Sequence, residues 1–433
     1  MKKRSFGKMT VRCAALILTA VLLFTSCMSE QEKLEKEKRD YLPIEITGYG
    51  LHKASNGTIT LNGEPFYGFG VNWHGCVSMS TKSKYAEEYW QDLAKMGVPY
   101  VRMMFGVFYA YEYDEWDKHR DKFLAKMDRA VAYAEKYHIG IVASLMWNYG
   151  AIPEHLGEPI DMIYHRESKT GQYIEEYLTT IVERYKDSPA IWMWEIGNEG
   201  SESPDTVQYI GIRNGVKSLE NWTYEDLTQY YKLVGDIIFE HDQYRMITGG
   251  DMSPRHASNS LRDNGAWSPL DTYEDTLETM SYTNVGHVNC ASVHYPDPDT
   301  WLDYYMRAAK ELNVAFWVGE FHGELFYNLE DKISAEESPE EANEQKTWND
   351  IVSVYLERDV QMFTTWCYAR VEQQSGDTTS LEIGAYNGIH QNYYQMERIT
   401  KVNADFVAEG KNRAAEYWNT ATYLFSDYDF DKK

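Results

Sequence analysis

The chain has 433 residues, with 67 acidic side chains against 42 basic ones and a formal net charge of −25. A surface this acidic argues against nucleic acid or another anionic polymer as a partner. Aromatic residues make up 15% of the chain, including 35 Tyr and 13 Trp. This is more than a core requires, and such rings also serve as flat apolar platforms for sugars.

The first 26 residues have the pattern of an export signal. A basic segment is followed by the apolar stretch 13–24 and by Thr25-Ser26-Cys27. The apolar stretch is too short to span a bilayer, which takes about 20 residues. We predict a lipoprotein signal peptide at 1–26 with lipidation at Cys27, because the segment resembles a bacterial lipoprotein cleavage box. An ordinary secretory signal or an uncleaved anchor remains the alternative.

Residues 27–41 are almost all charged or polar, which predicts a tether to a single domain at 42–433. No later segment is apolar enough to cross a membrane. Together with the predicted signal peptide and lipidation site, this leads us to expect an exported protein that is anchored by its lipid. Met28 rather than Asp after the lipidated residue favours the outer membrane, on its periplasmic or cell-surface face. Three cysteines remain, an odd number that gives no disulfide framework and no zinc motif. A bridge between Cys76 and Cys367 stays open.

Apolar, β-rich runs alternate with helical patterns along the domain. The predicted barrel strands are 67–72, 100–104, 140–146, 191–197, 246–249, 287–293, 315–319 and 361–366. The predicted helices include 84–96, 118–137, 171–185, 224–241, 299–312, 342–356 and 393–417. Eight such units favour an α/β fold of the (β/α)8 TIM-barrel type. We also expect an N-terminal β-hairpin at 58–66 below the barrel, and long loops after strands four and eight, at 200–222 and 368–391.

Two of the predicted strands lead to a glutamate. Glu199 follows the fourth strand and Glu320 the seventh, so the two carboxylates are expected to meet at the top of the barrel. A pair of carboxylates is the minimal equipment for cleaving a glycosidic bond, and their separation decides between retention and inversion. Glu195 lies about 13 Å further down the strand, and we interpret it as a structural carboxylate near the bottom of the barrel.

These motifs resemble glycoside hydrolase family 5, a family of cellulase- and mannanase-like retaining glycosidases. The resemblance covers most of residues 50–420. It rests on Asn198-Glu199 and Gly319-Glu320-Phe321, together with Gly70-Val71-Asn72-Trp73, Val101-Arg102, His294-Tyr295 and Trp366.

The resemblance implies a role for each matching residue. Glu199 would be the acid/base and Glu320 the nucleophile, kept ionised by Arg102. The substrate-binding set would be Arg102, Asn198, His294, Tyr295 and Trp366, with Trp73, Trp147 and Tyr149 as further sugar platforms. Within this set Asn198 would bind the sugar 2-hydroxyl, Tyr295 would donate to Glu320, and Trp366 would lie under the sugar at the cleavage point.

Three positions depart from the family pattern. His294 and Tyr295 are adjacent, whereas family members commonly separate them by one residue. Trp147-Asn148 stands where many members have a histidine. Gly200 follows the acid/base glutamate, where proline is common. These differences leave the chemistry in place and bear on the substrate.

The sequence therefore predicts a glycoside hydrolase that cleaves a β-glycan with retention, an endo-β-1,4-glycanase acting on glucan or mannan. An exo-acting β-glycosidase on oligosaccharides and a non-catalytic glycan-binding lipoprotein are the alternatives. A metal-dependent barrel hydrolase would need more ligands than His74 and His294 supply. We expect no metal, no cofactor, no nucleic-acid partner and a monomeric chain.

Overall fold

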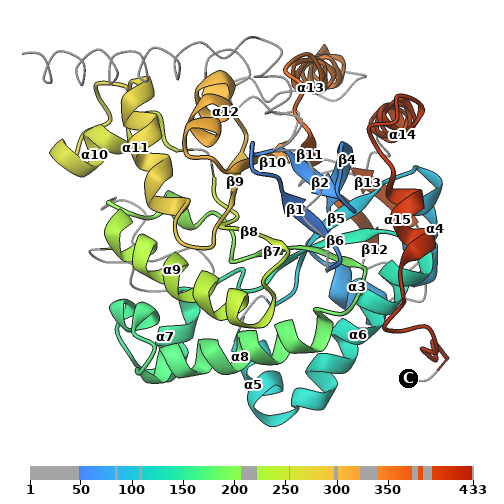
Figure 1. Ribbon diagram of the computed structural model, residues 1–433, viewed down its shortest axis with the longest axis horizontal. Helices are drawn as coiled ribbons and strands as arrows, with labels where there is room; N and C mark the ends of the chain where they lie inside the picture. Colours follow the sequence, from blue (N-terminus) through green and yellow to red (C-terminus); the bar gives the residue numbers. More distant parts are fainter. Residues whose placement is uncertain are drawn as a thin grey trace, which may run out of the picture. The chain divides into compact units, whose positions relative to one another are not determined.

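Eight parallel strands close into a barrel, and each overlaps one of the predicted segments (Figure 1). They are β4 (Gly68–Asn72), β5 (Tyr100–Met104), β6 (Gly140–Ser144), β7 (Ile191–Glu195), β8 (Met246–Thr248), β9 (Cys290–His294), β10 (Ala315–Phe321) and β11 (Met362–Thr365). The barrel closes where β11 pairs with β4, with Thr365 opposite Val71. The predicted (β/α)8 fold is confirmed.

This computed structural model describes residues 48–82, 86–106, 110–205, 222–252, 254–296, 301–321, 339–372, 379–383 and 393–431. Residues Glu45–Lys433 form one compact unit. The predicted signal peptide, the lipidation site and the tether lie outside the described residues, as does most of both predicted long loops. The loop after β11 includes a two-stranded antiparallel ribbon, β12 (Tyr368–Glu372) with β13 (Thr379–Ile383).

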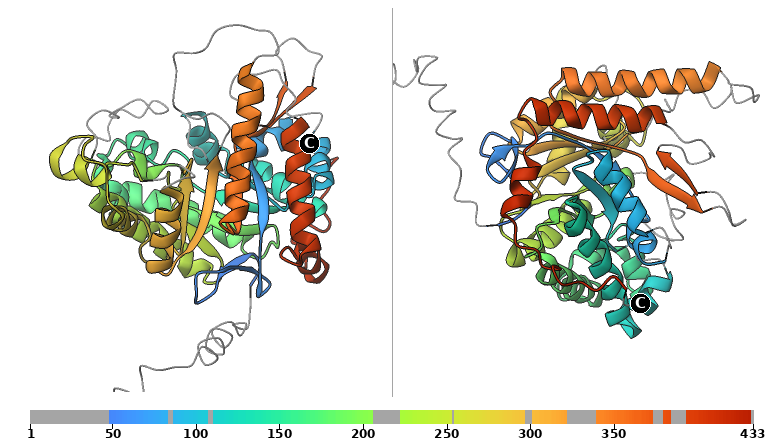
Figure 2. Two further views of the ribbon diagram at one scale, coloured as in Figure 1. Left: turned by 90° about the horizontal axis from the view of Figure 1, so that it is seen from above. Right: turned by 90° about the vertical axis from the view of Figure 1, so that its right-hand side faces the viewer.

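Helices surround the barrel in both orientations of Figure 2. The helices are α3 (Cys76–Lys82), α4 (Ala86–Lys95), α5 (Ala110–Lys118), α6 (Arg120–Tyr137), α7 (Ala151–Leu156), α8 (Lys169–Tyr185), α9 (Tyr224–His241), α10 (Ser258–Asn264), α11 (Tyr273–Thr283), α12 (Trp301–Glu311), α13 (Pro339–Glu357), α14 (Tyr393–Ala408) and α15 (Ala414–Thr420), with short 3-10 turns η1 (Ile160–Tyr164) and η2 (Gly200–Glu202). In the described part of the chain, no helix is both long and apolar enough to cross a bilayer.

Local sequence signals explain where two of these helices begin and end. Helix α9 starts as predicted because Thr223 and Asp226 form a reciprocal capping box at its N-terminus. The predicted helix 393–417 is instead two helices, α14 and α15. The chain turns between them through Gly410, whose φ of 71° is a left-handed conformation that glycine adopts without strain.

The predicted hairpin is present, and it lies against the N-terminal end of the barrel (Figure 2). Strands β2 (Ile59–Leu61) and β3 (Glu64–Pro65) pair with each other, and β1 (Leu51–Lys53) adds a third strand. The side chain of Gln361, just before β11, donates to the carbonyls of Ile59 and Phe66 at 3.0 and 3.1 Å. The opposite, C-terminal end is thereby left as the end where a site can form.

Side chains fill the barrel interior in layers. In one layer the Tyr100 hydroxyl and the Trp317 ring nitrogen lie 3.0 and 2.9 Å from Thr364 Oγ1. The three cysteines in the described residues, Cys76, Cys290 and Cys367, are buried and form no disulfide, so Cys76 and Cys367 are not bridged.

Candidate active site

Polar residues from five strands converge at the C-terminal end of the barrel. They are Asn72 at the end of β4, Arg102 on β5, Glu195, Asn198 and Glu199 at or beyond the end of β7, His294 and Tyr295 at the end of β9, and Glu320 on β10. Such a cluster at this end of the barrel is where the loops of a (β/α)8 enzyme form the active site.

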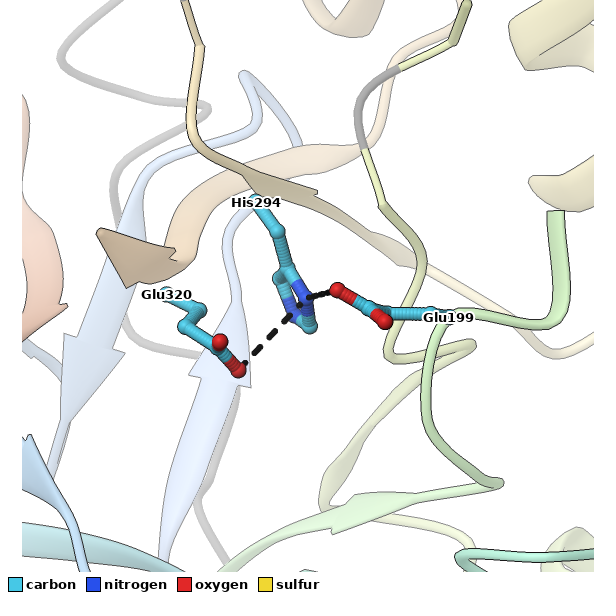
Figure 3. A group of neighbouring side chains, drawn as sticks. All are labelled: Glu199, His294 and Glu320. Atoms are coloured by element: carbon cyan, nitrogen blue, oxygen red, sulfur yellow. Dashed lines mark hydrogen bonds and ion pairs between the residues drawn. The ribbon is translucent and has the colours of Figure 1, made fainter. Parts of the chain in front are cut away.

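The two predicted carboxylates face each other across an imidazole (Figure 3). His294 Nδ1 lies 3.2 Å from Glu199 Oε1 and 3.7 Å from Glu320 Oε2. One oxygen of each glutamate and a ring nitrogen of His294 all lie within 4.8 Å of one another. Retaining glycosidases separate their carboxyl groups by about 5–5.5 Å and inverting ones by roughly 6.5–9.5 Å. The observed spacing therefore fits the retaining class.

Arg102 organises the base of the site from a fully buried position. Its guanidinium donates to Glu195 Oε2 at 2.8 Å, Asn72 Oδ1 at 2.9 Å, Glu320 Oε2 at 3.1 Å and Asn198 Oδ1 at 2.8 Å. The planar fork of arginine serves several acceptors at fixed angles, which a lysine cannot do. Because Asn198 Oδ1 is bound to Arg102, its amide NH2 is the group oriented to donate elsewhere.

Glu320 is buried and receives two strong donors. Arg102 is one, and the Tyr295 hydroxyl, which donates to Glu320 Oε1, is the other. Burial and the facing charge of Glu199 raise the pKa of Glu320 well above its ordinary value, while Arg102 opposes this shift. Two carboxylates this close retain one proton between them. Since both donors stabilise a negative charge on Glu320, we assign the shared proton to Glu199.

The surroundings of the imidazole between the carboxylates favour its uncharged form. Burial and the nearby Arg102 guanidinium lower the pKa of His294, and this outweighs the hydrogen bond with Glu199 that would raise it. A neutral ring can hydrogen-bond a carboxyl group without adding a positive charge that would compete with proton transfer.

Glu199 lies on a turn beyond the end of β7, with a backbone φ of 53°. A left-handed conformation costs a non-glycine residue about 1–3 kcal/mol, and such strain persists only where the surroundings impose it. Here the Glu199 amide donates to the Gly250 carbonyl at 2.7 Å. The next residue is glycine because an added Cβ on Gly200 would lie 2.5 Å from the Tyr231 hydroxyl. This packing explains why glycine replaces the common proline.

Two predicted aromatic platforms lie beside the carboxylates. Trp366, at the end of β11, is half-buried and stacks on His74, with ring centroids 5.3 Å apart and planes 15° apart. The ring centroids of Trp147 and Trp366 are 6.4 Å apart, and the Arg102 guanidinium lies 4.7 Å from the ring centroid of Trp147. Trp147 therefore extends the aromatic surface at the position where many family members carry a histidine.

Four of the residues predicted to bind substrate are buried. Trp73 is fully buried and packs against Trp90 with ring centroids 5.0 Å apart, so it presents no face to a sugar. Tyr149 is also buried, and its hydroxyl donates to the Gly200 carbonyl at 3.4 Å. Arg102 and His294, both predicted to bind substrate, have no exposed surface either, and Arg102 contacts Glu320 as the resemblance implied.

Sequence reasoning missed several partners of the site. Glu195 is structural, as expected, but it is the buried counter-ion of Arg102, which also contacts Glu320, so it lies at the site rather than near the barrel bottom. Asn72 donates to the Gly319 carbonyl at 3.0 Å, which ties β4 to the residue before Glu320. A polar residue ending an otherwise apolar strand was the available signal for both. Nothing in the sequence indicated Asp251 or Tyr231, which lie behind the Glu199 turn.

Among the described residues, one group of side chains has the spacing to hold a metal ion: Glu199, His294 and Glu320. These are the residues that the carboxylate chemistry uses, and Arg102 and Tyr295 already satisfy Glu320. Three O and N ligands suit a divalent transition metal.

The closed barrel, with the carboxylates of Glu199 and Glu320 at the C-terminal ends of its fourth and seventh strands, defines a barrel glycoside hydrolase. The model of the cellulase family (glycosyl hydrolase family 5) matches residues 59–369. The chain belongs to this family, as its sequence motifs predicted.

Individual relatives share shorter segments. The chain is 28% identical over 150 residues to a probable mannan endo-1,4-beta-mannosidase C of Aspergillus terreus, covering 33% of this chain and 36% of that protein. It is 33% identical over 87 residues to mannan endo-1,4-beta-mannosidase F of Aspergillus clavatus, covering 18% and 19%. The matches thus span about a third or less of the length of these curated relatives.

Solved structures extend the likeness to the whole fold. The endo-1,4-beta-mannanase of Rhizomucor miehei superposes with a TM-score of 0.58 at 17% identity, over 82% of this chain and 99% of that chain. An endo-beta-1,4-mannanase of Thermotoga petrophila gives 0.54 at 15% identity, over 79% and 78%. At such identities the likeness establishes the barrel fold.

Proposed function

We propose that this chain is a retaining endo-β-1,4-glycanase whose substrate is a mannan. The observation that carries the proposal is the pair Glu199 and Glu320, with carboxylate oxygens within 4.8 Å of each other. Membership of glycosyl hydrolase family 5 supports the reaction class. The choice of mannan over glucan rests on the curated relatives, which are mannan endo-1,4-beta-mannosidases.

The reaction follows from the placement of the side chains. The ionised Glu320 attacks the anomeric carbon while Glu199 protonates the departing glycosidic oxygen, which leaves a glycosyl ester on Glu320. Glu199, now ionised, removes a proton from water, and the water oxygen attacks the same carbon and releases Glu320. Asn198 donates to the 2-hydroxyl through its amide, and Trp366 stacks beneath the sugar ring.

Product analysis tests this function. The purified protein is incubated with mannan, glucomannan, carboxymethylcellulose, xyloglucan and mixed-linkage glucan, with Glu320→Gln as control. We expect new reducing ends from mannan and none with the variant. Activity confined to short oligosaccharides or aryl glycosides would favour the exo-acting alternative, and binding without turnover would favour the non-catalytic one.

Stereochemistry tests the double displacement separately. Proton NMR of the first product formed from a β-linked oligosaccharide should show the β-anomer before mutarotation, because two inversions restore the configuration. Initial appearance of the α-anomer would mean a single displacement and would overturn the role of Glu320 as nucleophile.

We further propose that the protein is exported and anchored by a lipid on Cys27, and that it acts as a monomer. The basic and then apolar pattern before this cysteine supports export. Metabolic labelling with an alkyne fatty acid should label the wild type but not Cys27→Ser, and the variant should leave the detergent phase on Triton X-114 partition. Label retained by the variant would contradict the assigned site.

A further inference from the structure

We infer that Asp251 is a positioning residue for the acid/base: it locks the turn that carries Glu199, through the backbone of Ser201 and the hydroxyl of Tyr231. The inference rests on the proposed function, because it assigns the proton-donating role to Glu199. Asp251 lies behind the turn and is only 5% exposed, so it acts without touching the substrate.

The segment after β8 runs alongside the segment after β7 and is bonded to it at alternate residues. Gly197 N donates to Gly249 O at 3.3 Å and Glu199 N to Gly250 O at 2.7 Å. Ser201 Oγ then donates to Met252 O at 3.1 Å. The backbone on both sides of Glu199 is thus held by the chain around Asp251.

The Asp251 side chain completes this contact. Its Oδ1 accepts from the backbone N–H of Ser201 at 3.1 Å and from the Tyr231 hydroxyl at 2.7 Å. Because Tyr231 belongs to helix α9, the carboxyl group joins the Glu199 turn to a helix of the outer layer. An added Cβ on Gly249 would lie 2.4 Å from Asp251 Oδ2, so the carboxyl group folds tightly over the end of β8.

Other buried hydroxyls hold the same turn from its remaining sides. Tyr149 donates to the Gly200 carbonyl at 3.4 Å and Tyr224 to the Ser201 carbonyl at 3.1 Å. The Tyr231 hydroxyl that serves Asp251 also occupies the space beside Gly200. Gly200, Tyr231 and Asp251 therefore form one packing unit, and it sits directly after the acid/base residue.

Positioning matters here because proton transfer needs a heavy-atom distance of about 2.6–3.2 Å. Glu199 has a left-handed backbone, and a turn released from its restraints relaxes away from that conformation. Burial raises the pKa of Asp251 to about 7, so the group is largely uncharged at acidic pH. Its role is then to accept two hydrogen bonds, and an asparagine at this position can do the same.

Two substrates with different leaving groups separate positioning of the acid from general damage. A 2,4-dinitrophenyl β-mannobioside needs little help from an acid to depart, whereas a phenyl β-mannobioside needs a proton. The ratio of kcat/KM, which reports the first displacement, isolates the contribution of Glu199 as an acid. General acid catalysis supplies about 10²–10⁴-fold, which sets the largest loss that mispositioning can cause.

We expect Asp251→Ala to lower kcat/KM on the phenyl glycoside by at least about 10-fold and to leave the dinitrophenyl value nearly unchanged. Asp251→Asn should restore most of the loss. Tyr231→Phe removes one of the two donors, so it should lower kcat/KM on the phenyl glycoside by a smaller factor and again leave the dinitrophenyl value nearly unchanged. This variant tests the inference if Asp251→Ala does not fold.

Glu135→Gln is the matched control. Glu135 is equally buried and accepts from Ser188 Oγ and from the amides of Leu424 and Phe425, all away from the catalytic end of the barrel. Glu135→Gln should change kcat/KM on both glycosides by the same factor. Equal losses on both substrates in the Asp251 and Tyr231 variants, or no loss, would overturn the positioning role. A wild type inactive on both glycosides and on mannan would instead overturn the proposed function.

Discussion

Glu320 and Glu199 face each other across His294, yet Glu320 lies within strand β10, where the pairing register shifts, whereas Glu199 lies on a turn beyond the end of β7. Strand β10 pairs Glu320 with His294 of β9, and two charge-assisted hydrogen bonds from Arg102 and Tyr295 hold its carboxyl group. Around the turn of Glu199, by contrast, the contacts between described residues are backbone hydrogen bonds, the hydroxyls of Ser201 and of tyrosines, and the Asp251 carboxyl group, with no arginine or lysine among them.

The difference matches what each carboxylate has to do. A nucleophile must keep its charge and its direction of attack, so fixed positive charge beside it is useful. An acid/base gains and loses a proton in every cycle, and a fixed charge would favour one of its two forms. Its position is therefore better fixed through the backbone than through an ion pair.

Replacing Arg102 should produce the largest effect, because it removes the charged support of Glu320. Arg102→Lys leaves Glu195 and Glu320 buried with incomplete partners, and breaking a buried pair costs about 3–5 kcal/mol of unfolding free energy. We also expect kcat/KM to fall by at least about 100-fold. Urea unfolding and kinetics on mannan measure both.

Arg245→Lys is the control for this variant. Arg245 is also buried, with Asp242 and the Ile191 carbonyl as partners, but it lies before β8 at the other end of the barrel. It should lose stability to a similar degree and keep the kcat of the wild type. Full activity in Arg102→Lys would show that Glu320 does not depend on the guanidinium fork.

Much of the fold could be predicted from the sequence because strand and helix periods are local. Helix α9 has the predicted bounds, and the structure shows that a capping box of Thr223 and Asp226 fixes its start. The break between α14 and α15 was missed because a single Gly410 in a long amphipathic pattern is a weak stop signal.

The site was predictable only in part, for a physical reason. Glu199 and Glu320 end apolar strands, and this pattern is visible in the chain. Trp73 also follows a strand, and the packing of rings from remote segments, such as Trp90 and Tyr368, buries it away from the cleft. Asp251 depends on contacts with a helix and a turn that are remote in sequence, and no local pattern records such contacts.

Substituting Asp251 should produce the next largest effect, because it changes the hydrogen-bond acceptor that supports the turn of Glu199. The pKa of Asp251 is raised to about 7 by burial, from an ordinary 3.8. Between these values the native state holds a proton that the unfolded chain has released, so stability falls as pH rises from about 4 to 7. Three pH units correspond to roughly 4 kcal/mol at most. Asp251→Asn lacks this titration.

Urea unfolding of both proteins at pH 4.5 and pH 8 checks this difference. The wild type should lose stability relative to Asp251→Asn at the higher pH, while their difference should be small at the lower pH. An Asp251→Asn variant whose stability follows the wild type across this range would mean that Asp251 is ionised throughout, and that its support is charged after all.

Removing one hydrogen-bond donor of Glu320 should have a smaller effect, seen as a shift in the pH profile of kcat/KM. Tyr295→Phe takes away a hydrogen bond that favours the ionised carboxylate, so the pKa of Glu320 rises further. The acid limb of kcat/KM should then move to higher pH by about one unit. Tyr417→Phe, whose hydroxyl donates to the Pro189 carbonyl at 2.6 Å, should leave the limb in place. A limb that does not move in Tyr295→Phe would assign it to another group.

The smallest expected effect is that of a chelator. If Arg102 and Tyr295 alone stabilise the charge on Glu320, then dialysis against EDTA should leave kcat on mannan unchanged.

Added Zn²⁺ should inhibit in competition with substrate, because Glu199, His294 and Glu320 present ligand atoms within 4.8 Å of one another. Zn²⁺ binding, measured by calorimetry, should be lost in Glu320→Gln, because this variant lacks one of the three ligands. Loss of activity in EDTA, restored by a divalent cation, would mean that a metal supplies the charge here assigned to Arg102, and the contrast between the two carboxylates would need a different explanation.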